Sequence, residues 1–379
     1  MKPEPDLLTR LGERTGGCEP GARVALADLA QSDPFGAQAF AALAARFGAA
    51  AGDGGWILAK KPRWRPGWVR PGDEAACLDL FESAFGYRVN ERLWRWKYRD
   101  ADPSGVGVWQ GDRLVAFYGG MPRDVLVRGQ SASAVQIGDV MVEPSQRGVM
   151  TRSGPFQIAA STFLERRIGH GRPHLLGFGF PTVKALQVAQ KLGLYAEVDQ
   201  ITQITWTADA SWRHRIAMRS TSLTAADGTA VDRLWERMAR DFAGSIIGVR
   251  DWKYVEARYV RHPTVEYRCI LLKRRFDGAP HALIVLRALE DGQAELVDIV
   301  GPRSSFDAAI SAARRWAADQ GAARVRAWIT SSHADALALQ SAESSPLGLV
   351  VPTNVWSPGP AVDEVRGRWW LMAGDTDFR

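Results

Sequence analysis

The chain of 379 residues is 46% hydrophobic and 24% charged, with a formal net charge of +6. This length exceeds that of one ordinary domain, and the apolar fraction is sufficient for two buried cores. No apolar run is long enough to cross a membrane, and the N-terminal stretch lacks the apolar core of a signal peptide. We therefore expect a cytoplasmic protein of two domains that does not associate with membranes.

Cysteine, histidine and charge patterns exclude several functional classes. Three cysteines lie far apart, as is typical of reduced thiols. His170 and His174 are four residues apart, but the glycine and proline between them exclude a regular helix face, so we predict no metal site. Basic residues alternate with acidic ones and form no long tract, which argues against nucleic acid as a partner. A small polyanion such as a nucleotide phosphate suits this mildly basic chain better.

Residues 1–62 are expected to form a small N-terminal extension. Phe40, Leu43 and Phe47 follow a helical spacing, which predicts a helix over 37–48. A short strand is predicted within 54–62.

Residues 63–208 are expected to form one mixed unit. The apolar patterns predict one strand, two helices, three strands, a helix, a strand, a helix and a further strand. The hairpin among them turns at Gln110-Gly111-Asp112. The later elements are predicted as a helix over 156–168, a strand over 174–180, a helix over 182–193 and strand material through 207.

Residues 209–379 repeat this order in degenerate form. The segment 249–263 parallels 87–103, since a basic residue and a tyrosine (Lys97-Tyr98 and Arg258-Tyr259) stand at matching places. Two strands around a turn, the strand AELVDIV, a helix, the strand RVRAWIT and a helix over SHADALALQ follow. We interpret this as an internal duplication. The fold class expected is α/β (α+β), with two units that each have a mixed, mostly antiparallel central sheet flanked by helices.

One segment carries a pattern suited to anion binding. In QIGDVMVEPSQRGVMTRSGPF (136–156), a strand is followed by a turn with Arg147 and Gly148 and then by a helix. Unpaired N–H groups at a helix N-terminus attract anions, a glycine admits a phosphate to the main chain, and an arginine adds a charged contact. An ordinary strand-to-helix turn with a surface arginine is the alternative.

Four segments, in this element order, resemble the GNAT superfamily of acyl-CoA-dependent N-acyltransferases, specifically members with two GNAT-like units in tandem. The segments are RLWRWKYRDADP, GDRLVAFYGGMP, QIGDVMVEP and RWWLMAGDTDF. The resemblance covers about residues 64–379. It implies acetyl-CoA or another acyl-CoA as co-substrate, with the pantetheine arm along the fourth strand and the pyrophosphate in the following loop. By that likeness the arm is lined by Val140, Met141 and Val142, and the loop that holds the phosphates consists of Gln146, Arg147, Gly148, Val149, Met150 and Thr151. The loop departs from the family pattern, because Val149 or Met150 stands where a glycine belongs.

Acyl transfer to an amine requires a group that removes a proton and one that protonates the leaving thiolate. In TVKALQVAQKLGL the family's usual tyrosine position is Ala189, so Tyr195 is the candidate acid by this resemblance. Asp139 is the candidate base, because a carboxylate within an apolar strand is either functional or paired with an arginine. Glu143 is a second choice. Asp375 and Asp377 are expected to be exposed.

The sequence therefore predicts an acyl-CoA-dependent N-acyltransferase acting on an amine of a small molecule or protein. One alternative keeps the fold but takes the acyl group from aminoacyl-tRNA. The other is a catalytically degenerate unit that binds a ligand or partner. Neither the acceptor nor the oligomeric state can be read from the sequence.

Overall fold

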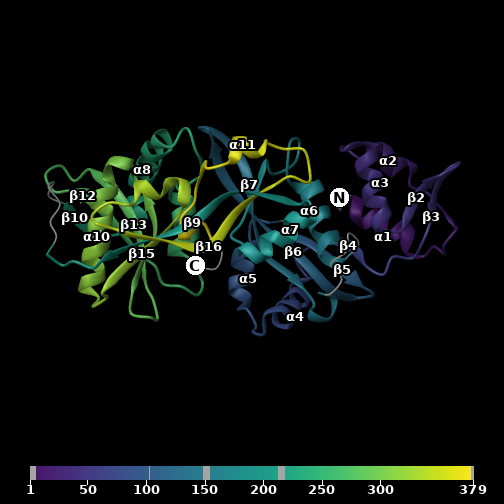
Figure 1. Cartoon of the computed structure of the whole chain (residues 1–379), viewed down its shortest axis with the longest axis horizontal. Coiled ribbons are helices and arrows are strands. Elements are labelled where there is room, and N and C mark those ends of the chain that lie inside the picture. Colours follow the sequence, from purple (N-terminus) through teal and green to yellow (C-terminus); the bar gives the residue numbers. More distant parts are fainter. Residues whose placement is uncertain (1–5, 102, 148–153, 212–217, 377–379) are drawn as a thin grey trace. The chain divides into compact units, whose positions relative to one another are not determined.

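The computed structural model describes residues 6–101, 103–147, 154–211 and 218–376 (Figure 1). Within these ranges no helix is long and apolar enough to cross a membrane. The described chain divides into two compact units: unit 1 comprises residues up to Met121 and Ile137–Pro173, and unit 2 comprises Pro122–Gln136 and the residues from His174 onward.

The two units do not coincide with the three expected segments. The segment 1–62 is grouped with unit 1, whereas the strand and helix expected over 174–193 are grouped with unit 2. The long strands β6 (Arg113–Val127) and β7 (Gln130–Val142) contribute residues to both units. The segment boundaries 1–62, 63–208 and 209–379 stay a prediction.

Unit 1 begins with a small module that has a core of its own. Its helices and strands are α1 (Leu7–Gly16), β1 (Arg23–Val24), α2 (Ala27–Ser32), α3 (Gly36–Arg46), β2 (Ala49–Gly52) and β3 (Gly55–Leu58). The three short strands are ordered β1-β3-β2, and Phe40, Leu43 and Phe47 are buried as their spacing predicts. The helices α2 and α3 are joined by a short turn and followed by the β2–β3 hairpin. This is the element order of a winged helix-turn-helix (Figure 1).

The remainder of unit 1 is a sheet with three helices. Its elements are β4 (Arg65–Val69), α4 (Glu74–Phe85), α5 (Glu91–Tyr98), β5 (Gly105–Gln110), the first part of β6, the last part of β7 and α6 (Pro155–Arg167). Strands β4, β5 and β6 pair antiparallel, and β6 turns from β5 at the predicted Gly111 position, where φ is +61°. Leu78, Phe81 and Phe117 belong to the core that α4 and α5 cover.

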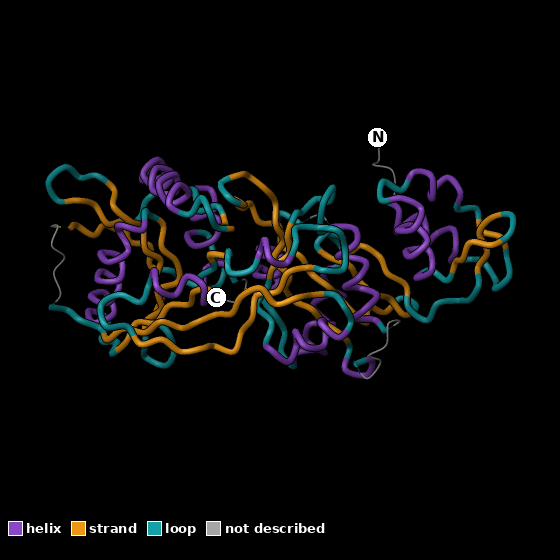
Figure 2. The backbone as a smooth tube through the Cα atoms, turned by 45° about the horizontal axis from the view of Figure 1, so that its top comes forward, coloured by secondary structure: helices purple, strands orange, loops and turns teal. Residues whose placement is uncertain are grey.

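Unit 2 contains a seven-stranded sheet of order β10-β12-β13-β14-β15-β9-β16, with helices packed beside its strands (Figure 2). Its elements are β8 (Leu176–Phe178), α7 (Val183–Lys191), β9 (Tyr195–Thr207), β10 (Met218–Ser222), α8 (Gly228–Asp241), β11 (Ile246–Gly248), α9 (Trp252–Val255), β12 (Arg268–Arg274), β13 (Pro280–Ala288), β14 (Ala294–Val300), α10 (Phe306–Asp319), β15 (Arg324–Thr330), β16 (Glu343–Asn354), α11 (Val362–Val365) and β17 (Trp369–Trp370). The pairs β10–β12, β12–β13 and β13–β14 are antiparallel, whereas β14–β15 is parallel. The expected class, mixed sheets flanked by helices, is confirmed.

One expected helix is wrong. The stretch SHADALALQ forms a short 3₁₀ segment, Ser331–Ala336, instead of an α-helix. Its Leu337 side chain is buried, but the chain then passes Gln340 and Ser341, whose φ values of +57° and +56° do not continue a right-handed helix. The periodicity of a stretch this short does not determine a helix.

Candidate active site

The strand β7 pairs with β8 along only part of its length. It pairs in parallel with β8 over Ala134–Gln136, and among the described residues β8 and β6 are its strand partners. Residues 137–142 of β7 therefore have β6 on one edge and no described strand on the other. An extended ligand with amide groups can pair with the main chain of such an edge.

Three predicted ligand-lining residues lie on this part of β7. Val140 is 36% exposed, whereas Met141 is buried in the core that α4 and α5 cover. Side chains of a strand alternate between its two faces, so Val140 and Met141 point to opposite faces and Val142 shares the face of Val140. The assignment of all three to a cofactor site stays a prediction.

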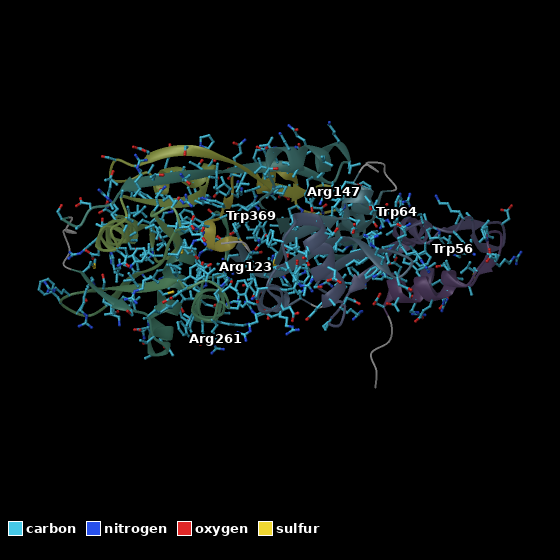
Figure 3. All side chains as sticks on the ribbon, turned by 90° about the horizontal axis from the view of Figure 1, so that it is seen from below. Trp56, Trp64, Arg123, Arg147, Arg261 and Trp369 are labelled. Atoms are coloured by element: carbon cyan, nitrogen blue, oxygen red, sulfur yellow. The ribbon has the colours of Figure 1, made fainter. Side chains whose placement is uncertain are left out.

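The predicted phosphate loop begins at a 3₁₀ turn, Pro144–Gln146. Gln146 Oε1 accepts a hydrogen bond from Arg63 at 3.1 Å. Arg147 donates from Nε to the carbonyl oxygen of Val142 at 3.0 Å and from Nη2 to that of Ala84 at 2.6 Å, and it is labelled in Figure 3. The guanidinium thus ties the turn to the last residues of α4.

The other predicted loop residues, Gly148, Val149, Met150 and Thr151, lie outside the described residues. The chain is described again at Gly154, which precedes Pro155 at the first position of α6. Proline there is favourable, because a first-turn N–H has no partner within the helix. The helix expected after this loop is therefore present and begins at Pro155.

Asp139 lies at the point where β7 departs from regular strand geometry. Its φ is +48°, in the left-handed region that aspartate enters more readily than most residues. Its carboxylate Oδ2 accepts a hydrogen bond from the Tyr98 hydroxyl at 2.9 Å and lies 2.5 Å from Lys97 Nζ. Both charged side chains are nearly buried, at 6% exposed for Lys97 and 8% for Asp139. The buried carboxylate is thus paired, with a lysine rather than an arginine.

The approach of Tyr98 to the sheet depends on a glycine. A Cβ added at Gly119 would lie 2.2 Å from the Tyr98 hydroxyl and 2.8 Å from the carbonyl oxygen of Gly138. Only glycine leaves room there, which explains one glycine of the pair in FYGGMP. The sequence pointed to Lys97 and Tyr98 as a repeat feature, but not as the partners of Asp139.

Glu143 lies at the edge of a cavity of about 630 Å³ between α4 and the β5–β6 turn. Its carboxylate accepts hydrogen bonds from Ser83 Oγ at 3.1 Å and is 2.7 Å from Arg113 Nη2. The Glu143 side chain is 12% exposed, and its role as a second choice of base stays a prediction.

Tyr195, the predicted acid, is the first residue of β9 in unit 2. It is 8% exposed and pairs with Asn354 of β16. Ala189 is a buried residue of α7, and Thr182 caps that helix by accepting from the Ala185 N–H. Asp139 and Tyr195 belong to different units, and their joint role stays a prediction.

The expectation that Asp375 would be exposed is wrong. Its carboxylate is 1% exposed and lies 2.5 Å from Arg250 Nη2 and 3.1 Å from Arg123 Nη2. Arg250 also contacts Asp298 at 3.0 Å, and burial raises the pKa of Asp298 although Arg250 opposes this shift. The sequence did not reveal this network, because its members are distant along the chain. Asp377 lies outside the described residues.

One protein-family model matches part of the chain. Residues 68–154 match the model of the acetyltransferase (GNAT) domain, which covers β4 to the start of α6. No curated protein matches the sequence significantly.

Several solved structures share the fold. A probable N-acyltransferase from Enterococcus faecalis is 15% identical with a TM-score of 0.58, over 76% of this chain and 71% of that one. A GCN5-related N-acetyltransferase from Kribbella flavida is 18% identical with a TM-score of 0.55, over 76% of this chain and 70% of that one. Another from Anabaena variabilis is 12% identical with a TM-score of 0.58, over 77% and 72%. Residues 68–154 thus match the acetyltransferase (GNAT) domain, and the chain shares the fold of these GCN5-related N-acetyltransferases.

Proposed function

We propose that this protein is an acyl-CoA-dependent N-acyltransferase that uses unit 1 to bind the co-substrate. The observation that carries the proposal is the edge of β7 over residues 137–142, which has no described strand partner and leads into a turn and the N-terminus of α6. A pantetheine arm contains two amides and can pair with such an edge, and its pyrophosphate would meet the N–H groups of the helix N-terminus.

The chain's own contribution to the reaction is mainly positioning. Placing an amine beside a thioester supplies much of the acceleration in such transfers. A main-chain N–H near the kink at Asp139 would polarise the thioester carbonyl. We assign Asp139 to holding this kink through Lys97 and Tyr98, since its carboxylate already serves both as an acceptor. The amine acceptor itself would need to be neutral to attack.

Tyr195 remains the proposed acid for the leaving thiolate. A tyrosine hydroxyl has an ordinary pKa near 10 and donates one proton. Tyr195→Phe removes that proton, so we expect kcat to fall about 100-fold or more while acyl-CoA affinity is retained. An unchanged kcat would leave Tyr195 with a packing role only.

Calorimetry with acetyl-CoA and longer acyl-CoAs tests the binding step. Arg147→Glu places a carboxylate at the start of the loop, and we expect it to weaken acyl-CoA binding about tenfold or more, equivalent to ~1.4 kcal/mol. Arg274→Glu makes the same charge change at an exposed hairpin turn in unit 2 and serves as the matched control. The absence of binding by any acyl-CoA at millimolar concentration would refute the proposal.

A second function is favoured by one observation, the buried alanine at position 189 of α7. A unit without a proton donor would bind acyl-CoA and not transfer it. An assay of free thiol release with a panel of amines separates the two: binding without turnover by the wild-type chain supports a binding protein.

A further inference from the structure

The two units repeat one hydrogen bond. In unit 1 the Tyr98 hydroxyl donates to Asp139 of β7, and in unit 2 the Tyr259 hydroxyl donates to Asp298 of β14 at 2.7 Å. In unit 1 a lysine precedes the tyrosine, and in unit 2 an arginine does. This places β14 in unit 2 at the position that β7 has in unit 1.

The strands next to them also correspond. Parallel pairing of β7 with β8 ends at Gln136, three residues before Asp139. Parallel pairing of β14 with β15 ends at Glu295, three residues before Asp298. The parallel pairs β7–β8 and β14–β15 therefore both end three residues before an aspartate, and the paired parts of all four strands are grouped with unit 2. In unit 1 the diverging edge of β7 is the proposed site of the pantetheine arm.

In unit 2 the gap between the diverging strands is filled by residues 369–375, here termed the filling segment. The Thr330 N–H of β15 donates to the carbonyl oxygen of Leu371 at 3.1 Å, and Ile329 pairs with Met372 as an antiparallel bridge. The turn that follows, Ala373–Asp375, contacts β14 and β15. The filling segment thus pairs its main chain with β15, across the gap from β14, the strand that corresponds to β7.

The side chains of the filling segment fit this gap closely. Trp369, Trp370, Leu371 and Met372 are each at most 1% exposed, and Trp369 is labelled in Figure 3. A Cβ added at Gly374 would lie 2.0 Å from the Tyr259 hydroxyl, the group that bonds Asp298. The main chain therefore passes directly against the repeated tyrosine–aspartate pair.

Buried ion pairs also lie in the gap between β14 and β15. Asp375 binds Arg250 through Nη2, and Arg250 Nε reaches Asp298 of β14 at 3.0 Å. Arg258 donates from Nε to the carbonyl oxygen of Gly374 at 3.0 Å. Arg250, Asp298 and Asp375 are all at most 1% exposed, so these groups leave no room beside them for an anionic ligand.

We propose that the filling segment is an internal substitute for the pantetheine arm in unit 2, so that each chain binds one acyl-CoA and binds it in unit 1. A polypeptide strand and pantetheine both present amide donors and acceptors along an extended chain, which allows one to take the place of the other at a strand edge. The inference rests on the proposed function for unit 1, whereas the filling of unit 2 stands independently of it.

Titration calorimetry of the full chain with acetyl-CoA tests the stoichiometry. We expect one site per chain, and we expect Arg147→Glu to weaken that site about tenfold or more while Arg274→Glu leaves it unchanged. Two sites per chain, or a single site that Arg147→Glu does not affect, would overturn the proposal. No binding at all would refute the proposed function, and the next measurement then decides the filling of unit 2.

Hydrogen exchange of the full chain without ligand tests the filling segment. We expect the amides of peptides that contain Thr330 and residues 369–375 to be protected from exchange as strongly as the amides of the paired strands β13 and β14. Gly374→Ala should increase exchange in both peptides by tenfold or more, because its Cβ meets the Tyr259 hydroxyl. Gly244→Ala, where an added Cβ meets nothing within 4 Å, is the matched control. Rapid exchange of the Thr330 amide in the wild-type chain contradicts the proposal.

Discussion

Asp139 has two unusual features, a left-handed backbone and a buried carboxylate. The backbone would cost free energy at most residues, but aspartate and asparagine tolerate it. The carboxylate is compensated by Lys97 and Tyr98. Such locally strained residues cluster at functional sites, because the surrounding structure must hold them. The position of Asp139 in the part of β7 that lies beyond its pairing with β8 fits a positioning role.

We predict strong energetic coupling between Lys97 and Asp139. Asp139→Asn should destabilise the protein by about 3–5 kcal/mol, since a buried ammonium loses its charge partner. In the background of Lys97→Met the same change should cost less than about 1 kcal/mol. Denaturant unfolding of the four proteins measures the coupling. Additive effects would show that the pair is not a buried ion pair, and the exposed Arg274–Asp277 pair provides the comparison.

His333 predicts a dependence of stability on pH. Burial lowers its pKa below the ordinary value, and its ring lies 5.5 Å from that of Trp370. The unfolded chain therefore binds more protons than the folded chain in the pH range just below 6.5. Stability contributed by the neutral ring is present above this range and is lost as the pH falls through it.

Replacement of His333 by glutamine tests this dependence. The slope of unfolding free energy against pH between about 5 and 7 should be smaller in His333→Gln than in the wild type. Equal slopes for the two proteins would show that folding does not lower the pKa of His333.

Among the helices, α6 links the N-terminal module to the domain that matches the acetyltransferase model. Arg166 Nη1 contacts Asp33 at 2.7 Å, and both side chains are at most 5% exposed. Arg46 of α3 lies 2.6 Å from Glu165 and also bonds Thr162. The helix follows directly on the predicted phosphate loop, so the module is attached to the helix whose N-terminus we assign to the co-substrate.

We expect Asp33→Asn to destabilise unit 1 by about 3–5 kcal/mol, because Arg166 would remain buried without its charge partner. Asp28→Asn, which removes an exposed partner of Arg14 within the same module, is the matched control and should have little effect. Thermal unfolding of both variants measures the difference. A cost for Asp33→Asn no greater than that of Asp28→Asn would mean that the module is not fastened through this pair.

The module has the element order of a winged helix-turn-helix but not its usual surface. The exposed positions of α3 are Gly36, Ala37, Gln38, Ala41, Ala42 and Ala45. The hairpin turn carries Asp53 between glycines. Lysine and arginine supply the charged contacts to phosphates, and the exposed positions of α3 carry neither. The surface of α3 therefore gives no support for nucleic acid as a partner.

The described residues of each unit form hydrophobic cores of their own. The largest lies within unit 2, and two others lie within unit 1, one under α4 and α5 and one in the N-terminal module. Closure of the unit 2 core depends on a segment far along the chain, because β17 pairs in parallel with β11. Trp370 packs there against Phe242, with ring centroids 4.3 Å apart.

Trp370→Ala should destabilise unit 2 by about 3–5 kcal/mol, the range typical of large aromatic truncations in a core. Denaturant unfolding measures this loss. Trp356→Ala provides the control, since Trp356 is 37% exposed in the same unit. A loss of similar size in both variants would show that the segment around Trp370 is not part of the core.

The sequence by itself determined the local elements and their order. Helical spacing placed α3, α6 and α7 within one or two residues, and the Gln110-Gly111-Asp112 turn placed the β5–β6 hairpin. These features depend on interactions between residues close in sequence, which patterns of apolar residues and glycines encode directly. The strand–turn–helix at 136–156 was found for the same reason.

Only the tertiary structure decided which residues meet. The pairing of Asp139 with Lys97, the buried Asp375 and the insertion of residues 369–375 beside β15 join segments that are far apart in sequence. A sequence pattern states that a carboxylate is buried or exposed on average, but not which cation will compensate it. That choice depends on the path of the backbone between the strands, because a buried charge is tolerated only where the fold brings a partner within hydrogen-bonding distance.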